Sequence, residues 1–427
     1  MTVQVTTLGN GLRIATDAMN SVETASVGVW VGAGTRDEAP EINGVSHLLE
    51  HMAFKGTERR DALAIAEEIE AVGGHLNAYT SREHTAYYAK VLKEDLPLAV
   101  DVIADILQHS KLDADELTRE RTVIIQEINQ SRDTPDDVVF DYFQETAYPE
   151  QAIGRPVMGS AEIIGNMPRE SIVGYMDDHY AAPNMVLTAS GRVDHDAFVA
   201  LGEEAFAGLT NFTPGERTAV KYVGGDFREP RELEQAHILF GLEGMSYSDD
   251  DFYAVSVLST ILGGGMSSRL FQEAREKRGL VYAIQSFHSF YADGGVFGVY
   301  AGTGENEVEE LIPVICDELR KMCDTVRDDE VARARAQLKA SLMMALESTS
   351  SRAEQLARQL MIFGRPLLIP EIIESVEAVD GAGVMRVAAR LLSSPLTSRP
   401  LAGWQRSRIT TPSLNGWLRA RLANTES

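Results

Sequence analysis

The sequence predicts an α+β protein made of two tandem duplicated α/β-roll domains, each an antiparallel-rich sheet packed against helices. Its 427 residues are too many for one hydrophobic core and suit two domains of roughly 200 residues. Short apolar strand-like segments are followed by longer helix-like segments in both halves. The two halves also resemble each other at an offset of about 212 residues, which indicates an internal duplication.

The repeat consists of segments with the same pattern in each half. The pairs are the apolar strands 26–32 and 236–244, the strands 87–92 and 296–301, and the helices 94–107 and 307–319. Residues 210–231 are polar and contain two prolines, so they are interpreted as a linker. The predicted parts are therefore residues 1–212, a linker with the first strand of the second domain at 213–232, and residues 233–427.

Residues 47–51 carry two histidines four positions apart, with Glu50 directly before the second. Residues four apart on a helix share one face, so both imidazoles can bind one metal ion. Glu50 lies on the same side, where a carboxylate can act as a base on water. Residues 43–46 can cap this helix, and its apolar residues are expected to pack inward behind the histidines; they are Val45, Leu48, Leu49 and Met52.

Two histidines rarely hold a catalytic metal without a further protein ligand. The helical pattern of residues 117–128 places Glu120 and Glu127 on one face, about two turns apart. One of them can bind the metal while the other orients a histidine. The simpler interpretation of either glutamate is exposed helix charge.

These residues resemble the pitrilysin/insulinase family of inverted-zincin metallopeptidases. The half-length branch, with the mitochondrial processing peptidases and their bacterial relatives, is the most similar. The resemblance implies a Zn²⁺ cofactor with His47, His51 and Glu127 as ligands. It implies that Glu50 is the general base and that Glu120 is the family's second carboxylate on the same helix as Glu127, which orients a ligand histidine.

Two further segments resemble the family. Asn77 and Ala78 precede the strand-like residues 85–92, and the resemblance implies that they bind substrate along a sheet edge, although an ordinary surface strand is the simpler interpretation. Arg275 and Tyr282 have the spacing of a family pair that contacts substrate carbonyls and stabilises the oxyanion. Without the resemblance, Tyr282 would be predicted as a core aromatic and Arg275 as a surface charge.

The second copy lacks the metal ligands. At the repeat offset, the four site residues correspond to Ser259, Leu262, Gly263 and Lys339. Residues 1–212 are therefore predicted to be the catalytic zinc-binding domain. Residues 233–427 are predicted to be a degenerate domain that carries the Arg–Tyr pair.

The composition restricts the possible binding partners and the cellular location of the protein. A net charge of −25 argues against nucleic acid and is compatible with cationic peptides. No apolar run approaches the ~18 residues that a membrane span needs, and no signal peptide is recognised. Cys316 and Cys323 lie on one predicted helix, too far apart for a disulfide, so they are expected to be free thiols. We therefore expect a cytoplasmic protein without a membrane partner.

The predicted function is that of a zinc metalloendopeptidase that cleaves unfolded peptides or presequence-like segments inside a closed chamber. The resemblance implies that two chains form the chamber, as a homodimer or as a heterodimer with a zinc-free homologue. Two alternatives stay open. One is a non-catalytic scaffold or partner subunit of a heterodimeric peptidase, and the other is a metal-dependent hydrolase of non-peptide substrates.

The C-terminal tail departs from the family pattern. Relatives end near residue 394 with an apolar strand, which Pro400 interrupts here, so such a strand is expected to be an edge strand or to end early. Residues 415–422 could form a short closing helix.

Overall fold

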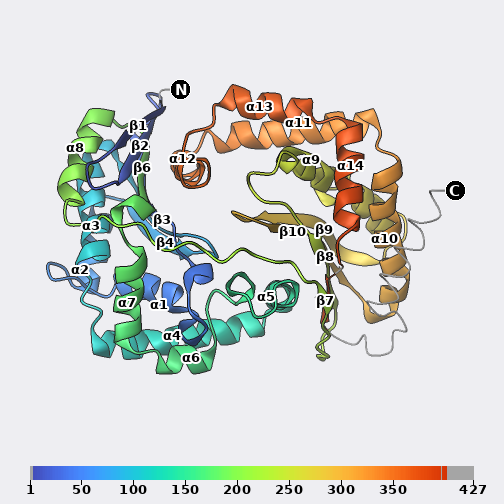
Figure 1. Cartoon of the computed structure of the whole chain (residues 1–427), viewed down its shortest axis with the longest axis horizontal. Helices are drawn as coiled ribbons and strands as arrows, with labels where there is room; N and C mark the ends of the chain where they lie inside the picture. The colour runs from blue at the N-terminus through green and yellow to red at the C-terminus, as the bar shows by residue number, and fades with distance from the viewer. Residues whose placement is uncertain (1–2, 396, 402–427) are drawn as a thin grey trace. The chain divides into compact units, whose positions relative to one another are not determined.

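A computed structural model describes residues 3–395 and 397–401 of the chain. The chain divides into two compact units (Figure 1). Unit 1 contains the residues up to Gln130, Arg155–Thr218 and Met343–Leu367. Unit 2 contains Ser131–Gly154, Ala219–Leu342 and the residues from Leu368 onward. The units are thus discontinuous in sequence, whereas the parts predicted from the repeat are continuous.

Unit 1 is built on a six-stranded sheet. In spatial order its strands are β1 (Val3–Thr7), β2 (Arg13–Ala18), β6 (Met185–Gly191), β3 (Thr24–Val31), β5 (Thr85–Leu92) and β4 (His75–Thr80). Strands β2 and β6 are parallel, and every other neighbouring pair is antiparallel. In the described residues β4 pairs with β5 alone, which makes it an edge strand.

Unit 2 repeats this topology. Its sheet has the order β7 (Gly225–Asp226), β11 (Thr397–Leu401), β8 (Ala236–Glu243), β10 (Gly295–Thr303) and β9 (Val281–Phe290). The pair β7–β11 is parallel, as β2–β6 is, and the other pairs are antiparallel. Each strand of this sheet therefore has a counterpart in unit 1, and the predicted fold class of two duplicated, antiparallel-rich α+β units is confirmed.

Helices cover both sheets. Unit 1 has α1 (Val45–Ala53), α2 (Ala62–Ala71), α3 (Leu96–Gln108), α6 (Ala161–Asn166), α7 (Arg169–His179), α8 (His195–Ala205) and α12 (Thr349–Phe363), and α4 (Ala114–Arg132) lies in it except for its last two residues. Unit 2 has α5 (Pro135–Ala147), α9 (Phe252–Gly263), the π-helical segment η6 (Phe271–Glu276), α10 (Val308–Asp324), most of α11 (Asp328–Ala345), α13 (Ile369–Ala378) and α14 (Gly381–Leu392). Short 3₁₀ turns are η1 (Thr35–Asp37), η2 (Pro40–Ile42), η3 (Lys93–Asp95), η4 (Ala152–Gly154), η5 (Ala182–Asn184) and η7 (Glu305–Glu307).

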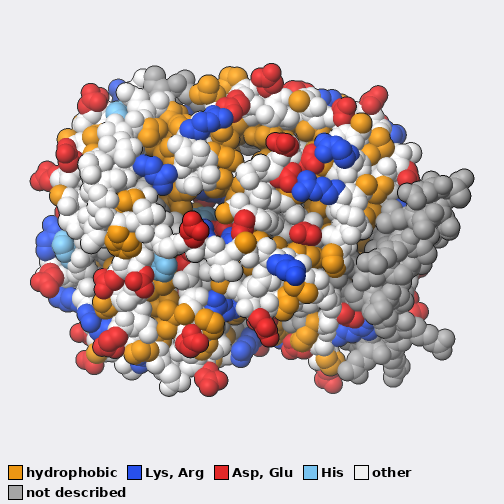
Figure 2. Space-filling model, viewed as in Figure 1, with side chains coloured by type: hydrophobic (Ala, Val, Ile, Leu, Met, Phe, Trp, Pro, Cys, Tyr) orange, Lys and Arg blue, Asp and Glu red, His pale blue; other side chains and the backbone are white. Residues whose placement is uncertain are grey.

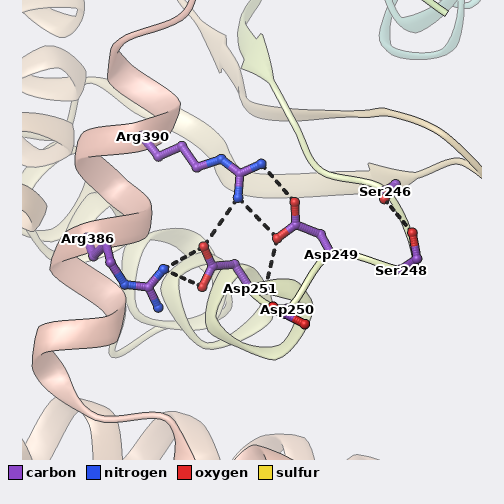
Figure 3. A pocket seen from close by; sticks show the side chains of 7 residues that line it. All are labelled: Ser246, Ser248, Asp249, Asp250, Asp251, Arg386 and Arg390. Atoms are coloured by element: carbon purple, nitrogen blue, oxygen red, sulfur yellow. Dashed lines mark hydrogen bonds and ion pairs between the residues drawn. The ribbon is translucent and has the colours of Figure 1, made fainter.

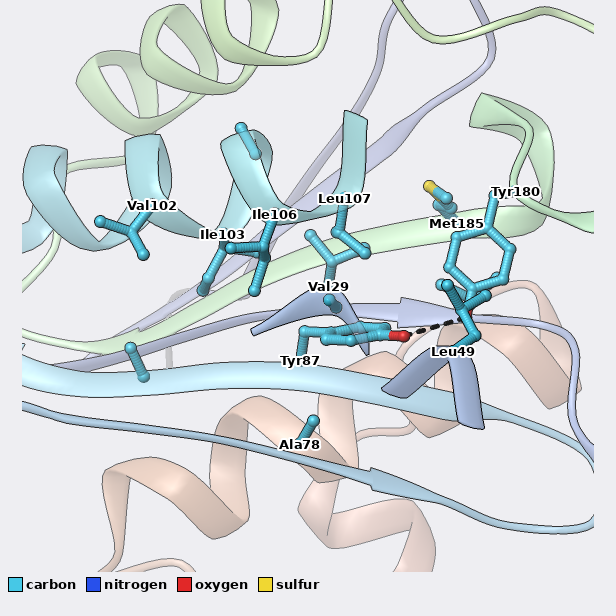
Figure 4. Packing of buried hydrophobic residues seen from close by; sticks show 14 of the residues in the cluster. Val29, Leu49, Ala78, Tyr87, Val102, Ile103, Ile106, Leu107, Tyr180 and Met185 are labelled. Atoms are coloured by element: carbon cyan, nitrogen blue, oxygen red, sulfur yellow. Dashed lines mark hydrogen bonds between the residues drawn. The ribbon is translucent and has the colours of Figure 1, made fainter. Parts of the chain in front are cut away.

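The main core of unit 1 lies between its sheet and α3. Figure 4 shows the apolar side chains of α3 above Val29 of β3 and Tyr87 of β5. Tyr87 is completely buried, and its hydroxyl lies 3.1 Å from that of Tyr180. This core holds β5, and with it the neighbouring edge strand β4, in a fixed position.

Helix α12 covers the opposite face of the unit 1 sheet, although it comes from the second half of the sequence. Its apolar side chains pack on Ala15, Trp30, Ala86 and Val186. In unit 2, α5 from the first half packs on β8 and β11. At the repeat offset α5 and α12 are equivalent helices, so the two copies have exchanged them.

The tail strand exists, but it is short. Strand β11 ends at Leu401, one residue after Pro400, and it pairs with β7 only at Thr397 and Ser398. Pro400 pairs with β8 but has no partner among the described residues on the β7 side of the strand. A proline, which has no backbone N–H to donate, is expected at such a position. The helix predicted at 415–422 lies outside the described residues.

Cys316 and Cys323 are both free thiols in α10, as predicted. Among the helices of the described chain, none is both long and apolar enough to cross a bilayer.

Candidate metal centre

Helix α1 carries the two histidines, and a buried carboxylate fixes its start. Gly44, the N-cap residue, has a φ of 94°, and a Cβ there would lie 2.6 Å from the carbonyl oxygen of Met158. Glycine has no side chain to cap the helix, and Glu38 takes this role. The carboxylate of Glu38 accepts hydrogen bonds from the backbone N–H of Gly44 and of Ser46, from the Ser46 hydroxyl and from the Asn43 amide.

The predicted inward face of α1 is confirmed. Its apolar side chains are at most 1% exposed; they are Val45, Leu48, Leu49 and Met52. Helix α1 packs on α7 and on the edge strand β4. The other face of the same helix therefore presents His47 and His51 at a fixed spacing.

His47, His51 and Glu127 come together. One possible ligand atom from each lies within 4.8 Å of the others. The Oε2 atom of Glu127 is 3.8 Å from Nε2 of His47 and 3.5 Å from Nε2 of His51. Ligand atoms around a tetrahedral zinc ion lie about 3.3 Å apart, so this donor set fits zinc after small side-chain adjustments.

Both histidines are prepared for metal binding. Burial and the neighbouring His51 lower the pKa of His47 to about 4, which keeps the imidazole neutral. In His51, Nδ1 lies 3.0 Å from Oε2 of Glu120. Since a carboxylate only accepts, Nδ1 carries the hydrogen and Nε2 keeps its lone pair for a metal ion.

Lys55 contacts the same carboxylate that binds His51, that of Glu120. Its ammonium group lies 2.8 Å from Oε1 of Glu120, whose side chain is only 6% exposed. The buried carboxylate is thus held between a cation and a histidine N–H. Glu120 and Glu127 share one face of α4, as the spacing predicted, but they have different contacts.

Glu50 lies beside these residues. Burial raises the pKa of its carboxyl group, while a hydrogen bond from Thr80 and the electrostatic interaction with His51 oppose that shift. The Thr80 hydroxyl donates to Oε2 of Glu50 at 2.6 Å. A half-buried carboxylate with a raised pKa can accept a proton and return it, as a general base must.

Asn77 and Ala78 lie on the edge strand β4, next to α1. The Asn77 side chain accepts the backbone N–H of Ala78 at 2.9 Å. The N–H and C=O groups on the outer side of an edge strand are free to pair with an extended peptide.

Arg275 and Tyr282 come together in unit 2. Arg275 lies in η6 and Tyr282 is the second residue of β9, and the guanidinium carbon is 5.7 Å from the centre of the Tyr282 ring. Tyr282 is 71% exposed, so its interpretation as a core aromatic is wrong. An exposed tyrosine beside an arginine presents two hydrogen-bond donor groups, a hydroxyl and a guanidinium, to the solvent.

A polar depression in unit 2 has a structural explanation (Figure 3). It lies at the start of α9 and is lined by serine hydroxyls, aspartates and two arginines. Arg386 and Arg390 of α14 form ion pairs with Asp251, and Arg390 also binds Asp249. These pairs neutralise one another and attach α14 to α9.

Three residues around the site were missed from the sequence: Glu38, Lys55 and Thr80. None of the three residues is itself part of a motif that indicates its role. Lys55 and Thr80 also contact residues that are distant in sequence, namely Glu120 and Glu50. Lys55 is four positions after His51, and Thr80 is two after Ala78, so only their closeness to named motifs could have drawn attention to them.

Known proteins resemble most of the chain. Residues 13–161 match the model of insulinase (peptidase family M16), and residues 166–338 match that of the peptidase M16 inactive domain. An uncharacterized zinc protease of Rickettsia felis is 38% identical over 92% of this chain and 96% of its own length. A probable mitochondrial-processing peptidase subunit beta of Arabidopsis thaliana is 40% identical over 91% of this chain and 76% of its own length.

Solved structures share the fold. A protease from Helicobacter pylori has a TM-score of 0.86 at 23% identity, and the match covers 94% of this chain and 99% of that one. A peptidase M16 inactive domain from Pseudomonas fluorescens has a TM-score of 0.88 at 19% identity, covering 94% of this chain and 98% of that one.

Proposed function

Because the chain belongs to the insulinase family of M16 peptidases, we propose that it is a zinc-dependent endopeptidase that cleaves unfolded peptides. Family membership supports a metallopeptidase role. The observation that carries the proposal is the convergence of His47, His51 and Glu127 next to Glu50.

The chemistry follows from the separate tasks of these residues. When bound, zinc acts as a Lewis acid that polarises a peptide carbonyl and lowers the pKa of water. Glu50 takes a proton from the attacking water and delivers it to the leaving nitrogen. Glu120 holds His51 in the tautomer that binds metal.

The substrate is proposed to bind as an additional strand on β4. The free edge of this strand can pair with any extended backbone, which gives affinity with little sequence preference. Asn77 and Ala78 lie on this strand, and Arg275 with Tyr282 would donate to the carbonyl oxygen as it becomes negative. A folded protein offers no free extended segment, so it would be a poor substrate.

Cationic presequence-like segments are the proposed substrate class. The net charge of −25 supports attraction of positively charged peptides. On the face drawn in Figure 2, acidic side chains are dispersed among basic and apolar ones. The proposed preference for cationic peptides is therefore supported by the negative net charge of the whole chain and not by a single acidic patch on that face.

Metal analysis with peptide digestion tests the function. The purified protein should contain about one zinc per chain and should cleave an unstructured peptide library in a chelator-sensitive manner, with cleavage sites read by mass spectrometry. Zinc content without cleavage, which a second homologous subunit restores, would favour the partner-subunit alternative. Cleavage of esters but not of peptides would favour the non-peptide hydrolase.

A further inference from the structure

Thr80 connects the edge strand with the proposed base. It is the last residue of β4, and its hydroxyl donates to Oε2 of Glu50 at 2.6 Å. The same hydroxyl lies 3.5 Å from the carbonyl oxygen of Ser46, at the limit of a hydrogen bond. A hydroxyl has one hydrogen to donate, so the short contact to Glu50 is the one that it satisfies.

The backbone that carries Thr80 is held from the other side of the sheet. The hydroxyl of the preceding residue, Tyr79, accepts the indole N–H of Trp30 at 3.3 Å and donates to Glu354 of α12 at 3.0 Å. Across the hairpin, Thr80 pairs with Thr85, a completely buried residue. The end of β4 is therefore fixed, and with it the position of the Thr80 hydroxyl.

Glu50 needs such a contact. Its side chain has three rotatable bonds, and helix packing fixes only its attachment point. In the part of the chain that the structure describes, Thr80 is the residue that hydrogen-bonds the Glu50 carboxylate. A donor on Oε2 selects one orientation and leaves Oε1 to exchange a proton.

We propose that Thr80 is a positioning residue that aligns Glu50 for proton transfer. Because Thr80 ends the strand on which a peptide would be added, the base is aligned by the same element that binds the substrate backbone. This inference rests on the proposed peptidase function. It assigns to Thr80 a role that acts through Glu50 and not through the metal ligands.

Substitutions at Thr80 distinguish the effect of its hydroxyl group from the effect of its side-chain shape. Thr80→Val should lower kcat about 10- to 100-fold, the effect of losing one hydrogen bond to a charged group, with KM and zinc content unchanged. Thr80→Ser keeps the hydroxyl and should restore kcat. A wild-type kcat in Thr80→Val, or a Ser variant as slow as the Val variant, would overturn the assignment.

Thr85→Val is the matched control. It removes a threonine hydroxyl from the paired position, where the donor bonds the carbonyl oxygen of Ala33 instead of Glu50. This variant should lose thermal stability but keep kcat.

Crystal structures give a readout that does not depend on activity. Wild-type protein should show one Glu50 conformer and Thr80→Val more than one. An unchanged single conformer would refute the positioning role, whether or not the protein cleaves peptides. If the wild type cleaves, Glu50→Gln does not and Thr80→Val matches the wild type, the Thr80 assignment alone fails. If the wild type shows no chelator-sensitive cleavage, the proposed function fails.

Discussion

Individual side chains around the metal centre have separable tasks. Glu127→Gln should reduce zinc content, because it replaces a ligand carboxylate with a weaker amide donor. Glu50→Gln should keep zinc and abolish cleavage, because the amide cannot accept the proton. Metal analysis and peptide hydrolysis measured on the same preparations would distinguish the two effects.

Glu120→Gln is the intermediate case for this comparison. It should weaken zinc affinity roughly 10- to 100-fold without removing a ligand, since Glu120 orients His51 through its Nδ1–H. For the Glu50→Gln variant of the preceding comparison, normal cleavage would contradict the assignment of Glu50 as the general base.

The exposed pair in unit 2 gives a second prediction. Tyr282→Phe and Arg275→Ala should each lower kcat/KM by roughly 10- to 1000-fold, because their contacts would strengthen as the oxyanion forms. Both residues are exposed, so neither change should lower the melting temperature or the zinc content. Unchanged kinetics in both variants would show that Arg275 and Tyr282 are surface residues without a role in catalysis.

Side-chain contacts were predictable where spacing along one helix determines them. The shared face of His47 and His51 follows from their separation by four residues. The hydrogen bonds of Glu38 and Thr80 were not predictable, because they depend on how a loop or a strand approaches α1 from elsewhere. A lone glutamate or threonine in the sequence gives no indication of such a partner.

Helix α1 depends on a cap that its own sequence lacks. Glu38→Gln should lower the free energy of unfolding by about 1–3 kcal/mol, because the amide nitrogen replaces one of the two oxygens and cannot accept the hydrogen bonds of that oxygen, which come either from Gly44 and Asn43 or from Ser46. Thermal and denaturant unfolding would measure the loss. Glu41→Gln, an exposed change in the same loop, is the control and should have little effect.

Glu38 should also make stability depend on pH. Burial, opposed by its hydrogen bonds to Ser46, Gly44 and Asn43, raises the pKa of Glu38 from 4.5 to about 7. Because the folded-state pKa lies above the unfolded value, the contribution of the Glu38 carboxyl group to the free energy of unfolding is complete below pH 4.5. It is lost as the pH rises through 7. The difference between wild type and Glu38→Gln should fall over this interval. A difference that rises with pH would contradict the sign.

Strands and helices were predictable as elements, but their partners were not all predictable. The apolar segments at 26–32 and 236–244 correspond to β3 and β8, and the repeat indicated two similar sheets. The exchange of α5 and α12 left no trace in the sequence, because an amphipathic helix shows that it covers a sheet without showing which one.

For the assembled protein, we propose a homodimer. One chain carries both the candidate metal ligands and the Arg–Tyr pair, so two identical chains would suffice for a closed chamber, and two-fold dimers are the commonest oligomers. Light scattering should give twice the chain mass of 46.8 kDa. An active monomer at assay concentration would contradict the chamber, whereas activity only after a zinc-free homologue is added would indicate a heterodimer.

The exchanged helix also sets the order of events during synthesis. The ribosome completes all six strands of the first sheet at Gly191, but α12 emerges only after residue 363. Until then Trp30 and Val186 lack their cover, and the nascent chain exposes an apolar surface. The first half therefore cannot reach its final fold before most of the second half is translated, and in the meantime its exposed apolar surface favours aggregation.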